Sequence, residues 1–269
     1  MLIWVCALHC EAKPVIDYYR LKKSQQTRAF ELYQGDNCAC IISGPGKIAS
    51  AAATAWAAAS FKQHAALAWL NLGIAGAADQ ALGSIFLINQ VTDAETRRSY
   101  YPVTTAKSAL AKASCISLSQ PSFDYHPSHL FDMEASAFLA TALRFSSAEL
   151  CQCIKVVSDN QSENQARDKH RISAFIQQHI QLIDEQARQL QALSEQLASL
   201  EVPAEAWQQL ASLARFSQTQ QARLRVLLAY LLGRDYSMTQ ILQQIGDASS
   251  SKAILGSLQQ MGYSDSNEL

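Results

Sequence analysis

The sequence Phe131-Asp132-Met133-Glu134-Ala135-Ser136, together with Val157-Ser158-Asp159 further along the chain, indicates the fold most clearly. The first segment opens a predicted helix with a Met-Glu pair, and the second ends a predicted buried strand with an aspartate. Because α/β folds place their ligand crevice outside the carboxyl ends of the strands, acids at such ends are candidates for one shared site. Glu11, which follows the first predicted strand, is a third acid of this kind.

Strands and helices alternate on both sides of these segments through about residue 200. We predict strands at residues 1–8, 30–34, 38–43, 67–72, 84–91, 114–118 and 153–157, and helices at 11–21, 48–62, 134–145 and 168–200. Pro14 would then lie in the first turn of its helix, where the missing N–H costs little. The alternation predicts an α/β unit in which a mostly parallel or mixed sheet is covered by helices on both faces.

Glycine-containing segments separate several of these elements. Gly35-Asp36-Asn37 lies between two short strands and predicts a hairpin. Gly44–Lys47 and Gly73–Ala77 each follow a predicted strand. Since each break follows the carboxyl end of a strand, we expect the breaks to cluster at the edge of the sheet where the acids lie.

The composition fits a chain with a substantial core, because 49% of its 269 residues are hydrophobic and 17% are charged. The net charge of −1 gives no reason to expect nucleic acid or an anionic membrane as a partner. No apolar run approaches the roughly 18 residues of a membrane-spanning helix. The apolar start, Met1–Leu8, lacks a basic region, so we expect a buried strand and a cytoplasmic protein, not a signal peptide.

The spacing of the cysteines argues against a metal site. Two Cys-x-Cys pairs occur, but there is no Cys-x-x-Cys pair and no histidine at zinc-finger spacing. An odd number of cysteines in buried-looking strands is typical of reduced core thiols in the cytoplasm. The seven cysteines are at positions 6, 10, 38, 40, 115, 151 and 153. We therefore expect neither a metal site nor disulfides.

The composition changes near Leu200, where a linker-like segment, Glu201–Glu205, leads into a helical region rich in Gln, Leu and Ala. We therefore predict two domains, an α/β domain at residues 1–198 and a small all-α appendage at 204–269. The predicted helices of the appendage are at 206–216, 219–232, 238–245 and 251–261. Ser237 and Gln240 form a capping-box pattern at the start of the third helix.

The last two predicted helices resemble a helix-turn-helix or winged-helix core, which would place the final helix in a DNA groove. However, DNA affinity depends mainly on neutralising phosphates with Lys and Arg. Residues 204–269 contain five Lys/Arg and five Asp/Glu, so their net charge is zero. We therefore expect a protein-interaction or oligomerisation bundle rather than a nucleic-acid-binding module.

Four short blocks occur in order along the first 190 residues: Ala7–Ala12, Ser43–Ala51, Asn71–Ala77 with Leu82–Ile85, and Asp132–Ala137 with Val157–Asp159. Together they resemble the purine nucleoside phosphorylase and nucleosidase superfamily, above all its 5′-methylthioadenosine/S-adenosylhomocysteine nucleosidase branch. This resemblance implies a three-layer sandwich with a central mixed sheet flanked by helices. It also implies a homo-oligomer, such as a dimer, and a reaction that needs no metal and no organic cofactor.

The resemblance implies that the protein hydrolyses the N-glycosidic bond of a purine nucleoside, such as a 5′-modified adenosine. Asp159 stands at the position of the general acid that protonates N7 of the leaving base, a role that burial in a closed pocket favours. Glu134 would accept hydrogen bonds from the ribose hydroxyls, and Met133 would pack against the sugar. Glu11 would orient or deprotonate the attacking water.

The other positions implied by the resemblance fall into two groups. Further substrate-binding residues are Ala75, Gly76, Ser158 and Phe123. Residues at a phosphate or water site are Gly44, Gly46 and Lys155, where Lys155 stands in place of an arginine found in many relatives. A lysine keeps the charge but loses the bidentate geometry of a guanidinium.

Two alternative functions remain open at this point. A phosphorylase would carry Gly-Asp and Arg phosphate-binding signatures near the first strand, which this sequence lacks, so hydrolysis is favoured. A non-catalytic nucleoside-binding or interaction protein is suggested by Ile74, which replaces the hydroxyl residue usual in the family. The short segment 117–131, where the nucleosidases contact the base, suggests it too.

Each candidate residue also has an ordinary structural explanation. Glu134 and Glu11 are acids in the first turns of predicted helices, where the helix dipole favours them. Asp159 has the residue type of a helix N-cap. Gly44, Gly46 and Gly76 suit tight turns. The order of the blocks favours the functional interpretation for Glu134 and Asp159, and leaves Glu11 evenly balanced.

Overall fold

The chain forms two units, Met1–Glu195 and Gln196–Leu269, which are described separately below. The computed structural model describes residues 1–25, 27–62, 64, 66–104, 107–122, 125–163, 168–199 and 202–264. The division falls close to the boundary that the change in composition suggests near residue 198.

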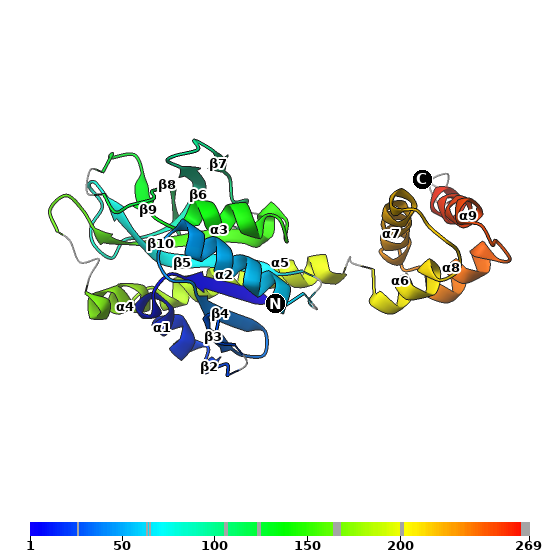
Figure 1. Ribbon diagram of the computed structural model, residues 1–269, viewed down its shortest axis with the longest axis horizontal. Coiled ribbons are helices and arrows are strands. Elements are labelled where there is room, and N and C mark those ends of the chain that lie inside the picture. The colour runs from blue at the N-terminus through cyan, green and yellow to red at the C-terminus, as the bar shows by residue number, and fades with distance from the viewer. Residues whose placement is uncertain are drawn as a thin grey trace. The chain divides into compact units, whose positions relative to one another are not determined.

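The first unit is built on one mixed sheet (Figure 1). Its central strand, β5, is parallel to β1 on one side and to β10 on the other. From β10 the pairing continues through β6, β8 and β9 and returns to β5, so these five strands close on themselves. The strands are β1 Leu2–Cys6, β2 Lys22–Lys23, β3 Glu31–Gln34, β4 Cys38–Ile42, β5 Ala68–Ala77, β6 Ile85–Asp93, β7 Ser99–Tyr100, β8 Ala111–Ser117, β9 Leu130–Asp132 and β10 Cys151–Asp159.

Helices cover both faces of this sheet, which confirms the predicted three-layer α/β fold. Helices α2 (Lys47–Ser60) and α3 (Ala135–Ala142) pack on one face. Helices α1 (His9–Tyr18), α4 (Lys169–Gln177) and α5 (Ile180–Ser199) pack on the other face (Figure 1). A short 3₁₀ turn, η1 (Ala148–Leu150), leads into β10.

The inner strands β1, β5 and β10 are buried on both faces, and most of their side chains are apolar. In β1, Ile3 and Val5 join the core beneath α2, whereas Trp4 points to the other face, where its ring lies 5.8 Å from that of Tyr19. This alternation follows the two-residue period of a strand. Such strands therefore appear in the sequence as continuous apolar runs.

Several elements differ from the sequence prediction. Helix α1 begins at His9 rather than Glu11, so Pro14 lies inside the helix and cannot donate to the carbonyl of Cys10. The Ser173 hydroxyl donates to that carbonyl instead, at 2.6 Å. Strand β5 continues through Gly73–Ala77, which the sequence suggested as a break. Strands β2, β7 and β9 were not predicted, and the helix predicted at 168–200 is divided into α4 and α5.

The second unit consists of helices α6 (Ala204–Ala211), α7 (Gln218–Leu232), α8 (Met238–Ile245) and α9 (Ser251–Ser264). Their apolar faces form a core of their own, which includes Leu224, Leu228 and Leu231 on α7. The capping box at Ser237 and Gln240 is confirmed, and Ser217 with Gln220 forms a second one at the start of α7.

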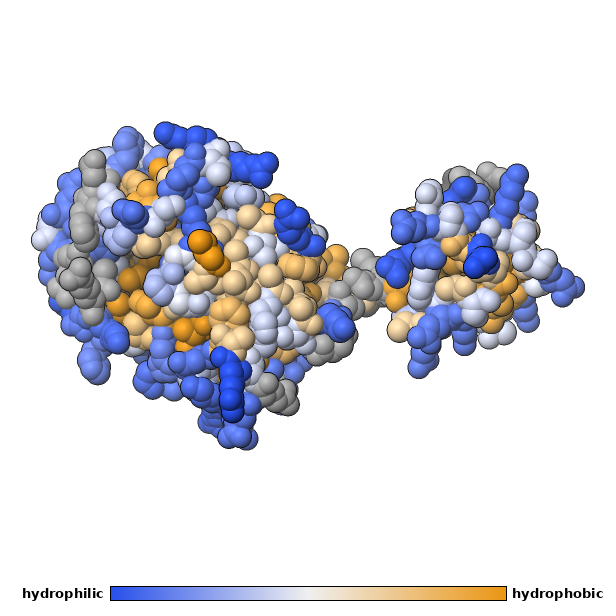
Figure 2. Space-filling view, viewed as in Figure 1, coloured by the Kyte–Doolittle hydropathy of each residue, from blue (hydrophilic) through white to orange (hydrophobic). Residues whose placement is uncertain are grey.

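The surface of the first unit is unevenly apolar. Figure 2 shows apolar side chains gathered on the face of α2, where Ile48 is 88% exposed.

Among the residues that the structure describes, no helix has the length and apolar character that crossing a bilayer would require. All seven cysteines are buried and unbridged, with Cys6 and Cys40 Sγ atoms 4.0 Å apart.

Candidate active site

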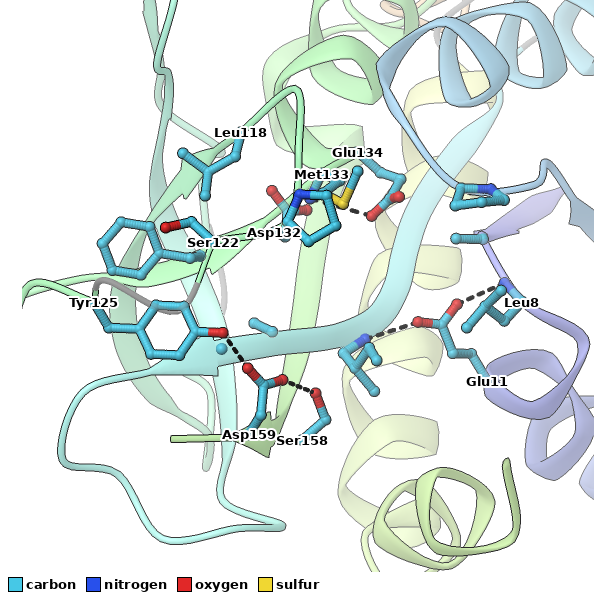
Figure 3. A pocket seen from close by; sticks show the side chains of 17 residues that line it. Leu8, Glu11, Leu118, Ser122, Tyr125, Asp132, Met133, Glu134, Ser158 and Asp159 are labelled. Carbon is cyan, nitrogen blue, oxygen red and sulfur yellow. Dashed lines mark hydrogen bonds between the residues drawn. The ribbon is translucent and has the colours of Figure 1, made fainter. Parts of the chain in front are cut away.

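A cavity of about 300 Å³ lies at the carboxyl ends of β1, β5 and β10 (Figure 3). The three acids selected from the sequence all line it: Glu11 from the first turn of α1, Glu134 at the N-cap of α3 and Asp159 at the end of β10. Its other lining residues are Ala7, Leu8, Pro45, Ile74, Ala75, Gly76, Leu118, Pro121, Ser122, Tyr125, Phe131, Asp132, Met133 and Ser158.

Glu11 is held in the wall of the cavity by two backbone amides. Its Oε2 accepts a hydrogen bond from Leu8 N at 2.8 Å, and its Oε1 accepts one from Ile74 N at 2.9 Å. The side chain is only 2% exposed. Burial and the nearby Glu134 carboxylate raise the pKa of Glu11 to about 7. Ile74 therefore contributes a backbone donor to this site although it has no hydroxyl group.

Glu134 reaches across to the loop before α2. Its Oε1 accepts from Gly46 N at 2.7 Å, and its Oε2 accepts from Met133 N at 3.3 Å. Gly46 has φ of +95°, a conformation that favours glycine, so this turn presents its amide to the acid. Burial and the Asp132 carboxylate raise the pKa of Glu134 above its ordinary value.

Lys155 and Asp132 form a fully buried ion pair behind the cavity. Lys155 Nζ lies 2.7 Å from Asp132 Oδ2, and the two side chains are 1% and 0% exposed. Although burial opposes its ionisation, the Lys155 ammonium keeps the pKa of Asp132 below its ordinary value. The second oxygen of Asp132 accepts from Ser117 Oγ at 2.6 Å. The ammonium is thus already paired, and Lys155 does not line the cavity.

The absence of a side chain at Gly73 brings the ion pair close to Glu11. A Cβ at Gly73 would lie 3.0 Å from Glu11 Oε1 and 3.4 Å from Lys155 Nζ. The lysine ammonium therefore faces a cluster of three acids, and the Asp132 and Glu134 carboxylates outweigh burial and raise its pKa. This arrangement balances part of the negative charge around the cavity.

Asp159 is 4% exposed and accepts hydrogen bonds on both carboxylate oxygens. Ser158 Oγ donates to Oδ1 at 2.6 Å, and the Tyr125 hydroxyl donates to Oδ2 (Figure 3). These contacts, and not a helix cap, are what hold the carboxylate. Tyr125 was not selected from the sequence, since nothing in its local pattern indicates that its ring turns back to the end of β10.

The structure brings most of the predicted residues together. Glu11, Ala75, Gly76, Met133, Glu134, Ser158 and Asp159 all line the cavity. Gly44, Gly46 and Lys155 do not line it, although Gly46 contacts Glu134 through its amide. Phe123 lies outside the residues that the structure describes. Within the described part of the chain, no group of three His, Cys, Asp or Glu side chains is arranged to hold a metal ion.

Comparison by sequence gives no match to a protein-family model or to a curated protein. Comparison of the structures gives clear matches. The apo structure of 5′-methylthioadenosine nucleosidase from Arabidopsis thaliana aligns with a TM-score of 0.58 and 14% identity, over 70% of this chain and 95% of that chain. The 5′-methylthioadenosine/S-adenosylhomocysteine nucleosidase of S. pneumoniae, solved with a transition-state inhibitor, aligns with a TM-score of 0.54 and 19% identity, over 72% and 100%.

A third solved structure extends the likeness to another hydrolase. Futalosine hydrolase of Helicobacter pylori aligns with a TM-score of 0.53 and 12% identity, over 70% of this chain and 97% of that chain. Each of these structures is matched almost completely. The first unit therefore has the nucleoside phosphorylase-like fold that these structures share.

Proposed function

We propose that the protein hydrolyses the N-glycosidic bond of a purine nucleoside, such as a 5′-modified adenosine, and releases the base. The observation that carries the proposal is that Glu11, Glu134 and Asp159 meet in one cavity of a nucleosidase-like fold. Three acids with different hydrogen-bond partners can take three different roles in one reaction.

In the proposed reaction the bond between C1′ and the base breaks, and its electron pair moves onto the purine. Asp159, in its protonated form, gives a proton to N7 of the leaving base, which keeps the base from departing as an anion. Glu134 accepts hydrogen bonds from the ribose hydroxyls. Glu11 takes a proton from water as the water oxygen bonds to C1′, so one water molecule is consumed for each base released.

The environment of Glu11 suits a general base. A base works best when its pKa lies near the operating pH, and burial brings the pKa of Glu11 to about 7. The two backbone amides that bind its oxygens fix the orientation of the carboxylate.

Water is favoured over phosphate as the nucleophile. The described residues that line the cavity include four acids but no Lys, Arg or His, and Lys155 is already paired with Asp132. A phosphate dianion would therefore enter a field of like charge without a cation to bind it. Phosphorolysis thus remains the second candidate, and nucleoside binding without turnover the third.

The test is base release from a panel of purine nucleosides, with and without phosphate, followed by chromatography. We expect free base without phosphate, with the fastest release identifying the preferred 5′-group. Release that requires phosphate would replace hydrolysis with phosphorolysis. If the folded protein binds nucleosides but releases no base, the binding function replaces both.

Glu11→Gln tests the assignment of the base through the pH dependence. In the unchanged protein we expect kcat/KM to rise with pH until Glu11 is ionised, with a midpoint near its pKa of about 7. The glutamine variant should lose this rise and about 10²–10⁴-fold of the rate on the alkaline side. A variant that keeps the rise would transfer the role of base to another group.

Ionisation of Glu11, which should raise the rate as pH rises, should lower the stability of the fold over the same pH interval. Because the pKa of Glu11 is raised in the folded state, its contribution to stability is fully present below the unfolded value near 4.5 and is lost as pH rises through about 7. Denaturant unfolding of the unchanged protein and of Glu11→Gln should therefore differ in their pH dependence across this interval. Parallel curves would contradict the raised pKa.

We also propose that the protein is a cytoplasmic homo-oligomer. The apolar face of α2, with the exposed Ile48, is of the kind that a second copy could cover, and buried unbridged cysteines suit a reducing compartment. The mass from sedimentation equilibrium tests the assembly, and that of a single chain at micromolar concentration would contradict it.

A further inference from the structure

Tyr125 contacts the candidate general acid, yet the proposed reaction gives it no role. Its hydroxyl donates to Asp159 Oδ2 while Ser158 Oγ donates to Oδ1, so both oxygens of the carboxylate have a donor. Burial and the neighbouring Asp159 carboxylate keep the pKa of Tyr125 above its ordinary value, which makes the phenol a donor throughout the neutral range. Asp159 is therefore held as a hydrogen-bond acceptor by these two hydroxyls.

The ring of Tyr125 also occupies part of the cavity. It stacks on Phe131 with ring centres 5.3 Å apart and planes 29° from parallel. Its phenol end lies against the backbone of β5, because a Cβ at Gly76 would clash with the ζ carbon and the oxygen of Tyr125. Gly76 is thus needed for the close approach of a flat ring, not for a turn. Figure 3 shows the hydroxyl pointing from this position to Asp159.

This position has the features that a purine base would need. It offers an aromatic face at Phe131, a glycine backbone that admits a flat ring, and a carboxylate at the polar edge of that ring. Aromatic rings prefer such offset contacts with one another. Ser158 already contacts one oxygen of Asp159. The base nitrogen that receives the proton would therefore have to lie against the other oxygen, which the Tyr125 hydroxyl contacts in this structure.

We propose that the Tyr125 side chain lies where the purine base binds, and that a purine binds by replacing its hydroxyl on Asp159. The inference rests on the proposed function, because it places the base beside Asp159. It makes Tyr125 a specificity-determining residue. A ligand that displaces the phenol without offering Asp159 a hydrogen bond leaves a buried carboxylate short of a donor, which costs affinity.

The test compares the affinity for adenine of the unchanged protein and of Tyr125→Phe by isothermal titration calorimetry. Phenylalanine keeps the ring and its contact with Phe131. It has no hydroxyl, so no hydrogen bond to Asp159 has to break when adenine binds. We expect Tyr125→Phe to bind adenine at least tenfold more tightly. Tyr101→Phe, at a tyrosine that is 62% exposed, is the matched control and should leave the affinity unchanged. Equal or weaker binding by Tyr125→Phe would overturn the proposal.

Two further measurements separate the possible outcomes. The first is thermal unfolding of the single variants Tyr125→Phe and Asp159→Asn and of the double variant. Without adenine, the stability change of the double variant should differ from the sum of the two single changes. In saturating adenine, the two changes should add. Coupling that persists with adenine would show that the phenol stays on Asp159, which contradicts the replacement. Tyr125→Leu, which lacks both ring and hydroxyl, should also tighten adenine binding and serves if the phenylalanine variant folds poorly.

The proposal and the enzymatic function can fail independently. Base release by a protein whose Tyr125→Phe variant binds adenine no better would leave the function standing and reject the role of Tyr125. Tighter adenine binding by the variant, without turnover of any nucleoside, would support the role of Tyr125 and reject the enzymatic function. Where turnover occurs, Tyr125→Phe should lower KM for the nucleoside without raising kcat. An unchanged KM would count against the replacement.

Discussion

Asp159→Asn is expected to lower base release by about 10²–10⁴-fold, because the amide cannot give a proton to N7 of the leaving base. The fall should appear in kcat, since the proton moves as the glycosidic bond breaks. The measurement is the rate of base release at saturating nucleoside, followed by chromatography. A variant with undiminished turnover would remove Asp159 from the mechanism.

This substitution should change the fold little. The Ser158 and Tyr125 hydroxyls that now donate to Asp159 can rotate, and one of them can accept from the amide instead. Asp184→Asn is a matched control. Asp184 is another buried aspartate, which accepts from the hydroxyls of Tyr18 at 3.0 Å and Tyr19 at 2.6 Å, and it does not line the cavity. Turnover by the folded control should match that of the unchanged protein.

The sequence predicted the layers of the fold and the meeting of the three acids for a simple physical reason. Buried strands are continuously apolar, and parallel strands bring their carboxyl ends to one edge. Asp159 at the end of β10 and Glu11 just after β1 therefore had to lie near each other once the strands were placed. Glu134 followed because the helix it precedes begins at the same edge.

The departures arise where a residue serves a contact that is distant in sequence. Gly73 and Gly76 suggested a break in the chain, yet they lie within β5, where the missing side chains leave room for Glu11 and for the Tyr125 ring. Similarly, Pro14 is tolerated inside α1 because Ser173, far along the chain, supplies a donor to the Cys10 carbonyl. No local pattern reports such partners.

Lys155 is the clearest example of a residue whose partner, Asp132, is distant in sequence. Its substitution gives the prediction with the largest effect on stability. We expect Lys155→Met to lower the free energy of unfolding by about 3–5 kcal/mol, because it leaves the Asp132 carboxylate buried without its cation. Methionine has a similar length and lacks the charge, so the loss reports mainly on the ion pair. Urea unfolding near pH 7 measures the change. Lys47→Met is a useful comparison, because the Lys47–Asp93 pair has side chains that are 17% and 11% exposed.

The pH dependence identifies the cause of that loss. In the unchanged protein the pKa of Asp132 is lowered, so its contribution to stability is present above the ordinary value near 3.8 and is lost as pH falls. Without the ammonium, burial should raise the pKa of Asp132, so the variant should instead lose stability as pH rises. Adding Asp132→Asn should restore most of the loss, since it removes the unpaired charge. If the double variant is no more stable than Lys155→Met alone, then packing and not charge is what Lys155 contributes to the wall of this site.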